Sequence, residues 1–268
     1  MLQLASSPRT ASLLAAALLC ATLPARATDY TITLMAQERV PPKWLMRNGH
    51  ADGYCPELLA AIERSEPRLH FKGLDNVRSL LVMEAGLASG TVQAACSILD
   101  TPQRRSIAQV VGKPLYLLRH RLAAAADDKA VVNSLADLAR LKAIVNTTRG
   151  AAFVGQLKAL GIAVDDSTGD AMVNLKKTLA GHGRFTYMSE QPLLSYMATP
   201  ELRGKLRMLP VVLREEPSYF WMSRKADPEA VRLVEHALAS LRASGELARI
   251  YARWMRAADP DLSPASAP

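Results

Sequence analysis

The sequence predicts an α/β protein built from two doubly wound lobes. Short apolar stretches typical of buried strands alternate with helical patterns along most of the 268 residues. This alternation occurs twice, and a charged connector of small residues at 123–132 separates the two runs. With 49% hydrophobic and 22% charged residues, the chain has an ordinary globular composition and enough apolar material for a core in each lobe.

Residues 1–27 are predicted to be a signal peptide. A positive charge at Arg9 precedes an apolar run at 11–23, which is too short to span a bilayer comfortably. Small residues at Ala25 and Ala27 then form a cleavage site, so we expect the mature protein in the periplasm. Lipoprotein processing at Cys20 is the alternative, although the leucine before it is a poor fit.

The charge and aromatic content argue against a nucleic-acid partner. Cleavage after Ala27 would remove Arg9 and Arg26 and lower the formal net charge from +8 to +6. The remaining basic residues are scattered, and no nucleic-acid motif is present. An aromatic content of 5% also disfavours a surface for stacking sugars or single-stranded bases.

The mature chain would keep two cysteines, Cys55 and Cys96. An even count in an oxidising compartment predicts a disulfide, with two buried free thiols as the alternative. Two cysteines without a histidine pair at useful spacing supply too few ligands for a metal, so we expect no metal site.

The first run has the order strand, helix, strand, helix, strand. Pro56 suits the first turn of a helix and Gly90 suits the end of one. In open α/β sheets, ligands bind beyond the carboxyl ends of the strands, where Trp44, Tyr54 and Ser97 fall. The expected strands are 30–35, 69–72 and 91–98, and the helices are 57–63 and 77–88.

The second run repeats this architecture. It opens with a capping box at Ser134, and Glu190 follows the carboxyl end of one of its strands. The expected strands are 142–146, 163–164, 184–188 and 206–213, and the helices are 151–160 and 170–180.

The last segment returns to a strand at 219–223 and two helices. Pro228 occupies the first turn of the first of these helices, and an amphipathic helix follows at 245–255. A tail rich in Pro, Ala and Ser at 258–268 is predicted to be disordered.

The joint order of several short motifs resembles the extracellular solute-binding proteins of family 3, the polar amino-acid type, which have the type II periplasmic-binding-protein fold. The resemblance implies crossovers near 116–121 and 213–218. Lobe 1 would then comprise 28–116 plus 217–257, and lobe 2 would comprise 117–216. The motifs are Gly53-Tyr-Cys-Pro-Glu-Leu-Leu, Gly90, Thr101-Pro-Gln-Arg104, Pro114-Leu-Tyr, Leu135-Ala-Asp-Leu-Ala-Arg-Leu, Gly150, and Asp227-Pro with Gly245-Glu and Ile250-Tyr-Ala-Arg-Trp254.

The same resemblance implies the site residues of lobe 1. Arg104 of the Thr-x-x-Arg motif would pair with a ligand carboxylate, which a guanidinium fork can bind through two hydrogen bonds. Thr101 fixes the spacing of that motif, and Ser97 matches a hydroxyl that contacts the ligand. Trp44 and Tyr54 lie where the family places side chains against the ligand.

On lobe 2 the resemblance implies two further contacts. Gly150 matches a glycine whose neighbouring N–H groups hold the ligand carboxylate at a helix N-terminus. Glu190 matches an acidic residue that binds the α-amino group of the ligand.

Other positions depart from the family pattern, which suggests a divergent branch with a different ligand. An aspartate is replaced by Gln93 before the third strand and by Phe185 in a later one, and Leu99 and Ala151 stand where polar residues are common. Arg149 adds a cation beside the family's glycine.

The resemblance implies a monomeric, non-catalytic periplasmic protein without a cofactor. It would capture a small, polar, carboxylate-bearing, amino-acid-like ligand for an ABC transporter or a sensor. The alternative is an enzyme on the same scaffold, such as a cyclic-acid dehydratase, in which Glu190 would be the candidate for acid–base chemistry.

Overall fold

The computed structural model describes residues 28–38 and 40–258. The predicted signal peptide lies outside the described residues, as does the predicted tail apart from Ala258. No helix in the described ranges is long and apolar enough to cross a membrane.

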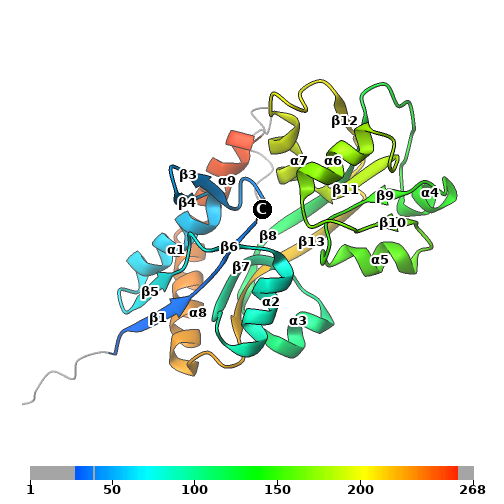
Figure 1. Cartoon of the computed structure of the whole chain (residues 1–268). Helices are drawn as coiled ribbons and strands as arrows, with labels where there is room; N and C mark the ends of the chain where they lie inside the picture. Colours follow the sequence, from blue (N-terminus) through cyan, green and yellow to red (C-terminus); the bar gives the residue numbers. More distant parts are fainter. Residues whose placement is uncertain (1–27, 39, 259–268) are drawn as a thin grey trace, which may run out of the picture.

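Lobe 1 carries the N-terminal elements and also the last two helices of the chain (Figure 1). One core lies around α1 and α8, and a second lies where α2 packs near Trp221 of β13. The elements are β1 (Tyr30–Thr33), β2 (Ala36–Gln37), β3 (Leu45–Arg47), β4 (His50–Asp52), α1 (Tyr54–Ser65), β5 (Leu69–Lys72), β6 (Val77–Arg78), α2 (Leu80–Ser89), β7 (Ala94–Leu99), α3 (Pro102–Ile107), α8 (Pro228–Ala243) and α9 (Glu246–Ala258).

Lobe 2 has its own two hydrophobic clusters, one around Phe185 and Tyr187 and one around Leu175 and Leu193. Parallel pairing places β9 between β10 and β11. The elements are α4 (Leu135–Arg140), β9 (Val145–Asn146), α5 (Phe153–Ala159), β10 (Val164–Asp165), α6 (Ala171–Leu179), β11 (Phe185–Ser189), α7 (Glu190–Met197) and β12 (Leu206–Met208).

Two long antiparallel strands, β8 (Ala108–Ala125) and β13 (Arg214–Ser223), run from one lobe into the other (Figure 1). β8 pairs with β11 and β12 in lobe 2, and β13 pairs with β7 in lobe 1. The fold is therefore the predicted one, with two α/β lobes joined by two crossover segments. The stretch that contains the Pro114-Leu-Tyr motif is part of the continuous strand β8.

The predicted helix at 77–88 begins later than expected because Ser79 caps it. The Ser79 hydroxyl accepts a hydrogen bond from the Val82 amide, and the two residues before Ser79 pair with β2 as strand β6. Gly90 ends this helix in the left-handed conformation, at φ 84°. The β3–β4 hairpin, whose turn lies at Asn48–Gly49, was not predicted as strands.

A candidate ligand-binding cleft between the lobes

A cavity of about 140 Å³ lies between the two lobes. Lobe 1 contributes the loop at 40–43 before β3, the start of α1, the start of α2 and the end of β7. Lobe 2 contributes Thr148–Arg149, the start of α5 and the turn from β11 into α7. Tyr251 and Met255 of α9 also line it. The volume corresponds to roughly ten water molecules, which suits a small organic ligand.

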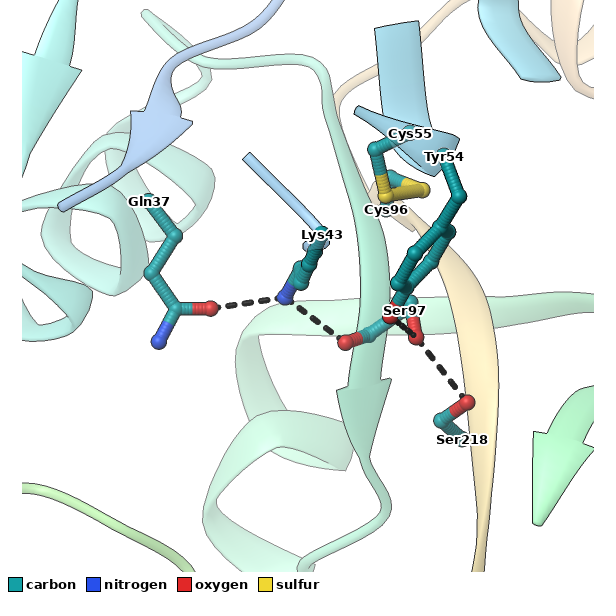
Figure 2. The surroundings of a disulfide bond; sticks show 7 residues. All are labelled: Gln37, Lys43, Tyr54, Cys55, Cys96, Ser97 and Ser218. Atoms are coloured by element: carbon teal, nitrogen blue, oxygen red, sulfur yellow. Dashed lines mark hydrogen bonds between the residues drawn. A yellow bond between two sulfur atoms is a disulfide. The ribbon is translucent and has the colours of Figure 1, made fainter. Parts of the chain in front are cut away.

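The second half of β7, which carries Ser97, forms one wall of this cavity. Ser97 has φ 52°, a left-handed conformation that is uncommon for residues with a side chain and often marks functional sites. The hydroxyl groups of Tyr54, Ser97 and Ser218 form a chain, with O–O distances of 2.9 and 3.0 Å (Figure 2). Because Ser218 donates onward to the Tyr116 carbonyl, Tyr54 must donate to Ser97 and Ser97 to Ser218.

Arg104 lies at the cavity, as expected, but its guanidinium already has partners. Its Nε donates to Glu84 Oε1 at 2.7 Å and its Nη1 donates to the Leu99 carbonyl at 2.7 Å. Both side chains of this ion pair are buried. Thr101 does not line the cavity. Its hydroxyl accepts a hydrogen bond from the Arg104 amide and so caps α3.

The structure adds a cation that sequence reasoning missed, Lys43. Its ammonium donates to Gln37 Oε1 at 2.6 Å and to the Ser97 carbonyl at 2.7 Å (Figure 2). The side chain is buried, and within the described ranges no carboxylate forms an ion pair with it. Burial, and secondly the charge of Arg104, hold the pKa of Lys43 well below its usual value.

The loop that carries Lys43 is held against the start of α1. The amides of Tyr54 and Cys55 donate to the carbonyls of Pro42 and Lys43, each at 3.2 Å. Gly53 makes this approach possible, because a Cβ there would lie 2.6 Å from both carbonyl oxygens and φ is 119°. Burial of Lys43 is thus a property of the loop and helix together.

The predicted disulfide between Cys55 and Cys96 is present, with Cα atoms 6.0 Å apart (Figure 2). It joins the first turn of α1 to the middle of β7, next to Tyr54 and Ser97. The disulfide therefore holds Tyr54 and Ser97 on one wall of the cavity.

Glu190 is placed differently from the expectation. It is buried and does not line the cavity, although its neighbours Ser189 and Gln191 do. Its carboxylate forms ion pairs with Arg121 Nε at 2.7 Å and Arg119 Nε at 3.4 Å. Both arginines project from β8, so this carboxylate is occupied within lobe 2.

Two further predicted residues also lie outside the cavity lining. Trp44 is buried in the main core of lobe 1. Gly150 has φ 77°, and a Cβ there would lie 3.0 Å from the Leu81 side chain of α2. Gly150 therefore marks a close approach of the two lobes, while Arg149 and Ala151 on either side of it line the cavity.

The described residues contain no group of three or more His, Cys, Asp or Glu that could hold a metal ion. The polar groups at the cavity are instead mainly hydroxyls, amides and cations, together with the exposed carboxylate of Glu38. Such groups can bind an oxygen-bearing or anionic ligand by hydrogen bonds.

The fold is shared with many solved structures. A histidine kinase sensor domain with similarity to periplasmic binding proteins has a TM-score of 0.74 at 21% identity, covering 85% of this chain and 97% of that one. A structure from a study of glutathione import and the cystine ABC importer of Streptococcus mutans has a TM-score of 0.71 at 17% identity, covering 85% and 95%.

A third structure, an ancestral amino-acid-binding protein described as a precursor of cyclohexadienyl dehydratase, has a TM-score of 0.68 at 16% identity, covering 84% of this chain and 95% of that one. No curated protein matches the chain. The family model for bacterial extracellular solute-binding proteins, family 3, matches residues 32–257. The chain belongs to this family.

Proposed function

We propose that this protein is an exported, monomeric solute-binding protein that captures a small carboxylate-bearing ligand between its lobes. The observation that supports this most directly is a cavity that both lobes line and that two buried cations, Lys43 and Arg104, border. A ligand that contacts both walls would stabilise the closed arrangement of the lobes. That closed form would be recognised by an ABC transporter or a sensor.

The proposed contacts come mainly from lobe 1. Lys43 and Arg104 supply positive charge, Tyr54 and Ser97 supply the hydroxyl wall, and Arg149 reaches the cavity from lobe 2. Thr101 supports Arg104 through the helix cap. Because Trp44, Gly150 and Glu190 lie outside the lining, we do not include them among the direct contacts.

We favour binding over catalysis because the best acid–base candidate is occupied. A general acid or base must reach the ligand, and Glu190 is instead ion-paired with Arg119 and Arg121 away from the cavity. We therefore propose that the protein does not turn over its ligand.

The test is isothermal titration of the purified mature chain against a panel of amino acids and small organic acids, preceded by native mass spectrometry to detect a co-purified ligand. We expect at least one carboxylate to bind with micromolar or tighter affinity, a free energy of about −8 kcal/mol. Absence of binding across the panel would contradict the proposal, and chemical conversion of a bound acid would contradict its non-catalytic part.

A further inference from the structure

The charges around the cavity are unbalanced. Among the described lining residues the cations are Lys43, Arg104 and Arg149, and the single carboxylate belongs to Glu38, whose side chain is exposed. Arg104 is balanced by the buried carboxylate of Glu84, so the buried cation that has no ion pair within the described ranges is Lys43. An exposed carboxylate is screened by solvent and compensates little of a buried charge. The cavity therefore favours a ligand with net negative charge.

Lys43 and Arg104 differ in what they still lack. Arg104 has a buried carboxylate, Glu84, at 2.7 Å. Lys43 has two neutral acceptors, and a buried ammonium without a counterion is costly. An ammonium has three N–H donors, so one remains beyond those given to Gln37 and Ser97. A ligand carboxylate would supply both the charge and the missing acceptor.

The same cavity offers poor binding to an ammonium group. The acid that the family pattern assigns to this role, Glu190, is occupied by two arginines and does not line the cavity. Glu84 is likewise occupied by Arg104. The hydroxyls of Thr148 and Ser189 can accept hydrogen bonds but carry no negative charge. An α-amino group would thus share the cavity with cations, and like charges repel.

The rest of the lining is apolar and comes from both lobes. Apolar side chains favour contact with a hydrocarbon part of the ligand, and they offer no hydrogen-bonding group to a polar ligand tail. They include Pro41, Leu80 and Leu99 on lobe 1 and Phe153, Met188 and Pro192 on lobe 2.

We propose that the ligand is a carboxylic acid with an apolar body and no amino group, and that Lys43 is the residue that binds its carboxylate. This inference rests on the proposed function and names its ligand class. It assigns Lys43 a role that no sequence motif indicated, and it agrees with the pairing of Glu190 to two arginines and with Leu99 at a position where polar residues are common.

The test uses matched ligands that differ only in the α-amino group or the charge. Titration calorimetry with 3-phenylpropionate, L-phenylalanine and 3-phenylpropanamide is run on the wild type, and 4-methylpentanoate against L-leucine forms a second pair. We expect each acid to bind about 10- to 100-fold more tightly than its α-amino counterpart, and the amide to be weaker than the acid by a similar factor.

Two variants locate the effect. Lys43→Met keeps an unbranched side chain that is one atom shorter and removes the ammonium, and should lose about 10- to 100-fold in affinity for the acids. Lys113→Met, at an exposed lysine outside the cavity lining, should leave affinity unchanged. Circular dichroism checks folding, and the wild-type ligand pairs decide the ligand class even where a variant fails to fold.

The outcomes separate the two proposals. Amino acids that bind as tightly as the matched acids overturn this inference and leave the proposed function standing. Acids that are preferred but are unaffected by Lys43→Met overturn the role of Lys43. Failure of every acid and amino acid to bind the wild type overturns both proposals.

Discussion

Arg104 and Lys43 are two buried cations at one cavity, and they are stabilised in opposite ways. Arg104 forms an ion pair with Glu84 inside lobe 1, whereas the acceptors of Lys43 within the described ranges are the neutral oxygens of Gln37 and Ser97. Removing a buried cation that has a buried counterion destabilises the fold, because the counterion is left uncompensated. A buried cation without one is expected to cost stability and to be retained for binding.

The largest expected effect comes from breaking the paired cation. Arg104→Met should destabilise the protein by about 3–5 kcal/mol because it leaves the Glu84 carboxylate buried and uncompensated. Urea unfolding measures the change. Arg105→Met is the matched control, since Arg105 is an exposed residue paired with Asp100 and should cost less than about 1 kcal/mol.

A double variant distinguishes loss of a charge pair from loss of packing. Glu84→Leu together with Arg104→Met removes both charges and should recover much of the lost stability. If the double variant is no more stable than Arg104→Met alone, the ion pair is not the reason that Arg104 matters.

Removing the disulfide tests whether burial of Lys43 depends on the wall that supports it. The cysteines are 41 residues apart, so Cys55→Ser with Cys96→Ser should cost about 2–4 kcal/mol in unfolding experiments. It should also weaken acid binding, because the disulfide fixes the start of α1, where the amide of residue 55 donates to the Lys43 carbonyl. A reducing agent should destabilise the wild type and leave the double variant unchanged. Equal sensitivity of both proteins would contradict this interpretation.

Lys43→Met should have a much smaller effect on stability. Its removal leaves no charge without a partner, so we expect a change within about 1 kcal/mol, in the stabilising direction. Chemical denaturation without ligand measures it, with Lys113→Met as the control. A loss comparable to that of Arg104→Met would show that Lys43 is a structural cation and would remove the contrast between the two residues.

The smallest expected effect is the pH dependence of the difference in unfolding free energy between the wild type and Lys43→Met. The pKa of Lys43 is lowered in the folded state, so between that pKa and its ordinary value of 10.5 the unfolded chain binds more protons. The stability of the wild type relative to Lys43→Met should therefore rise as the pH is raised from 7 towards 10. The nearby Tyr54 does not interfere, because burial raises its pKa above the usual range.

Denaturation at several pH values, with the variant measured in parallel, gives this difference directly. The other ionisable groups are the same in both proteins, so their contributions to the pH dependence cancel to first order. A relative stability that is flat with pH would mean that folding does not lower the pKa of Lys43, and one that falls with pH would mean that folding raises that pKa.

Local patterns in the sequence were enough to predict the fold. Strand β5 at Leu69–Lys72 lies where its apolar alternation placed it, and helix α1 surrounds the predicted 57–63 segment. The disulfide was predicted from the cysteine count. Arg104 was singled out by the family resemblance of a short motif, and it lines the cavity. Each of these depends on residues close in sequence or on a pair with few alternatives.

The partners of the ionisable groups could not be predicted in the same way. Glu190 meets its arginines because β11 pairs antiparallel with β8 in a register that sets Met188 opposite Arg121 and Ser189 opposite His120. Sequence alone does not give that register. Burial of Lys43 depends on a close contact between its loop and Gly53. Sequence alone does not indicate that contact, because a lysine in a loop usually keeps its ammonium in solvent.

The paired strands β8 and β13 give the molecule a mechanical property. A two-stranded antiparallel ribbon twists more easily than it stretches, so the lobes should turn about it and not slide apart. The β8–β13 pairing becomes irregular between Ser218 and Phe220. Ser218 is also the end of the hydroxyl chain that starts at Tyr54 in the cavity. A torque on the ribbon therefore acts at a residue connected to the cavity wall by two hydrogen bonds.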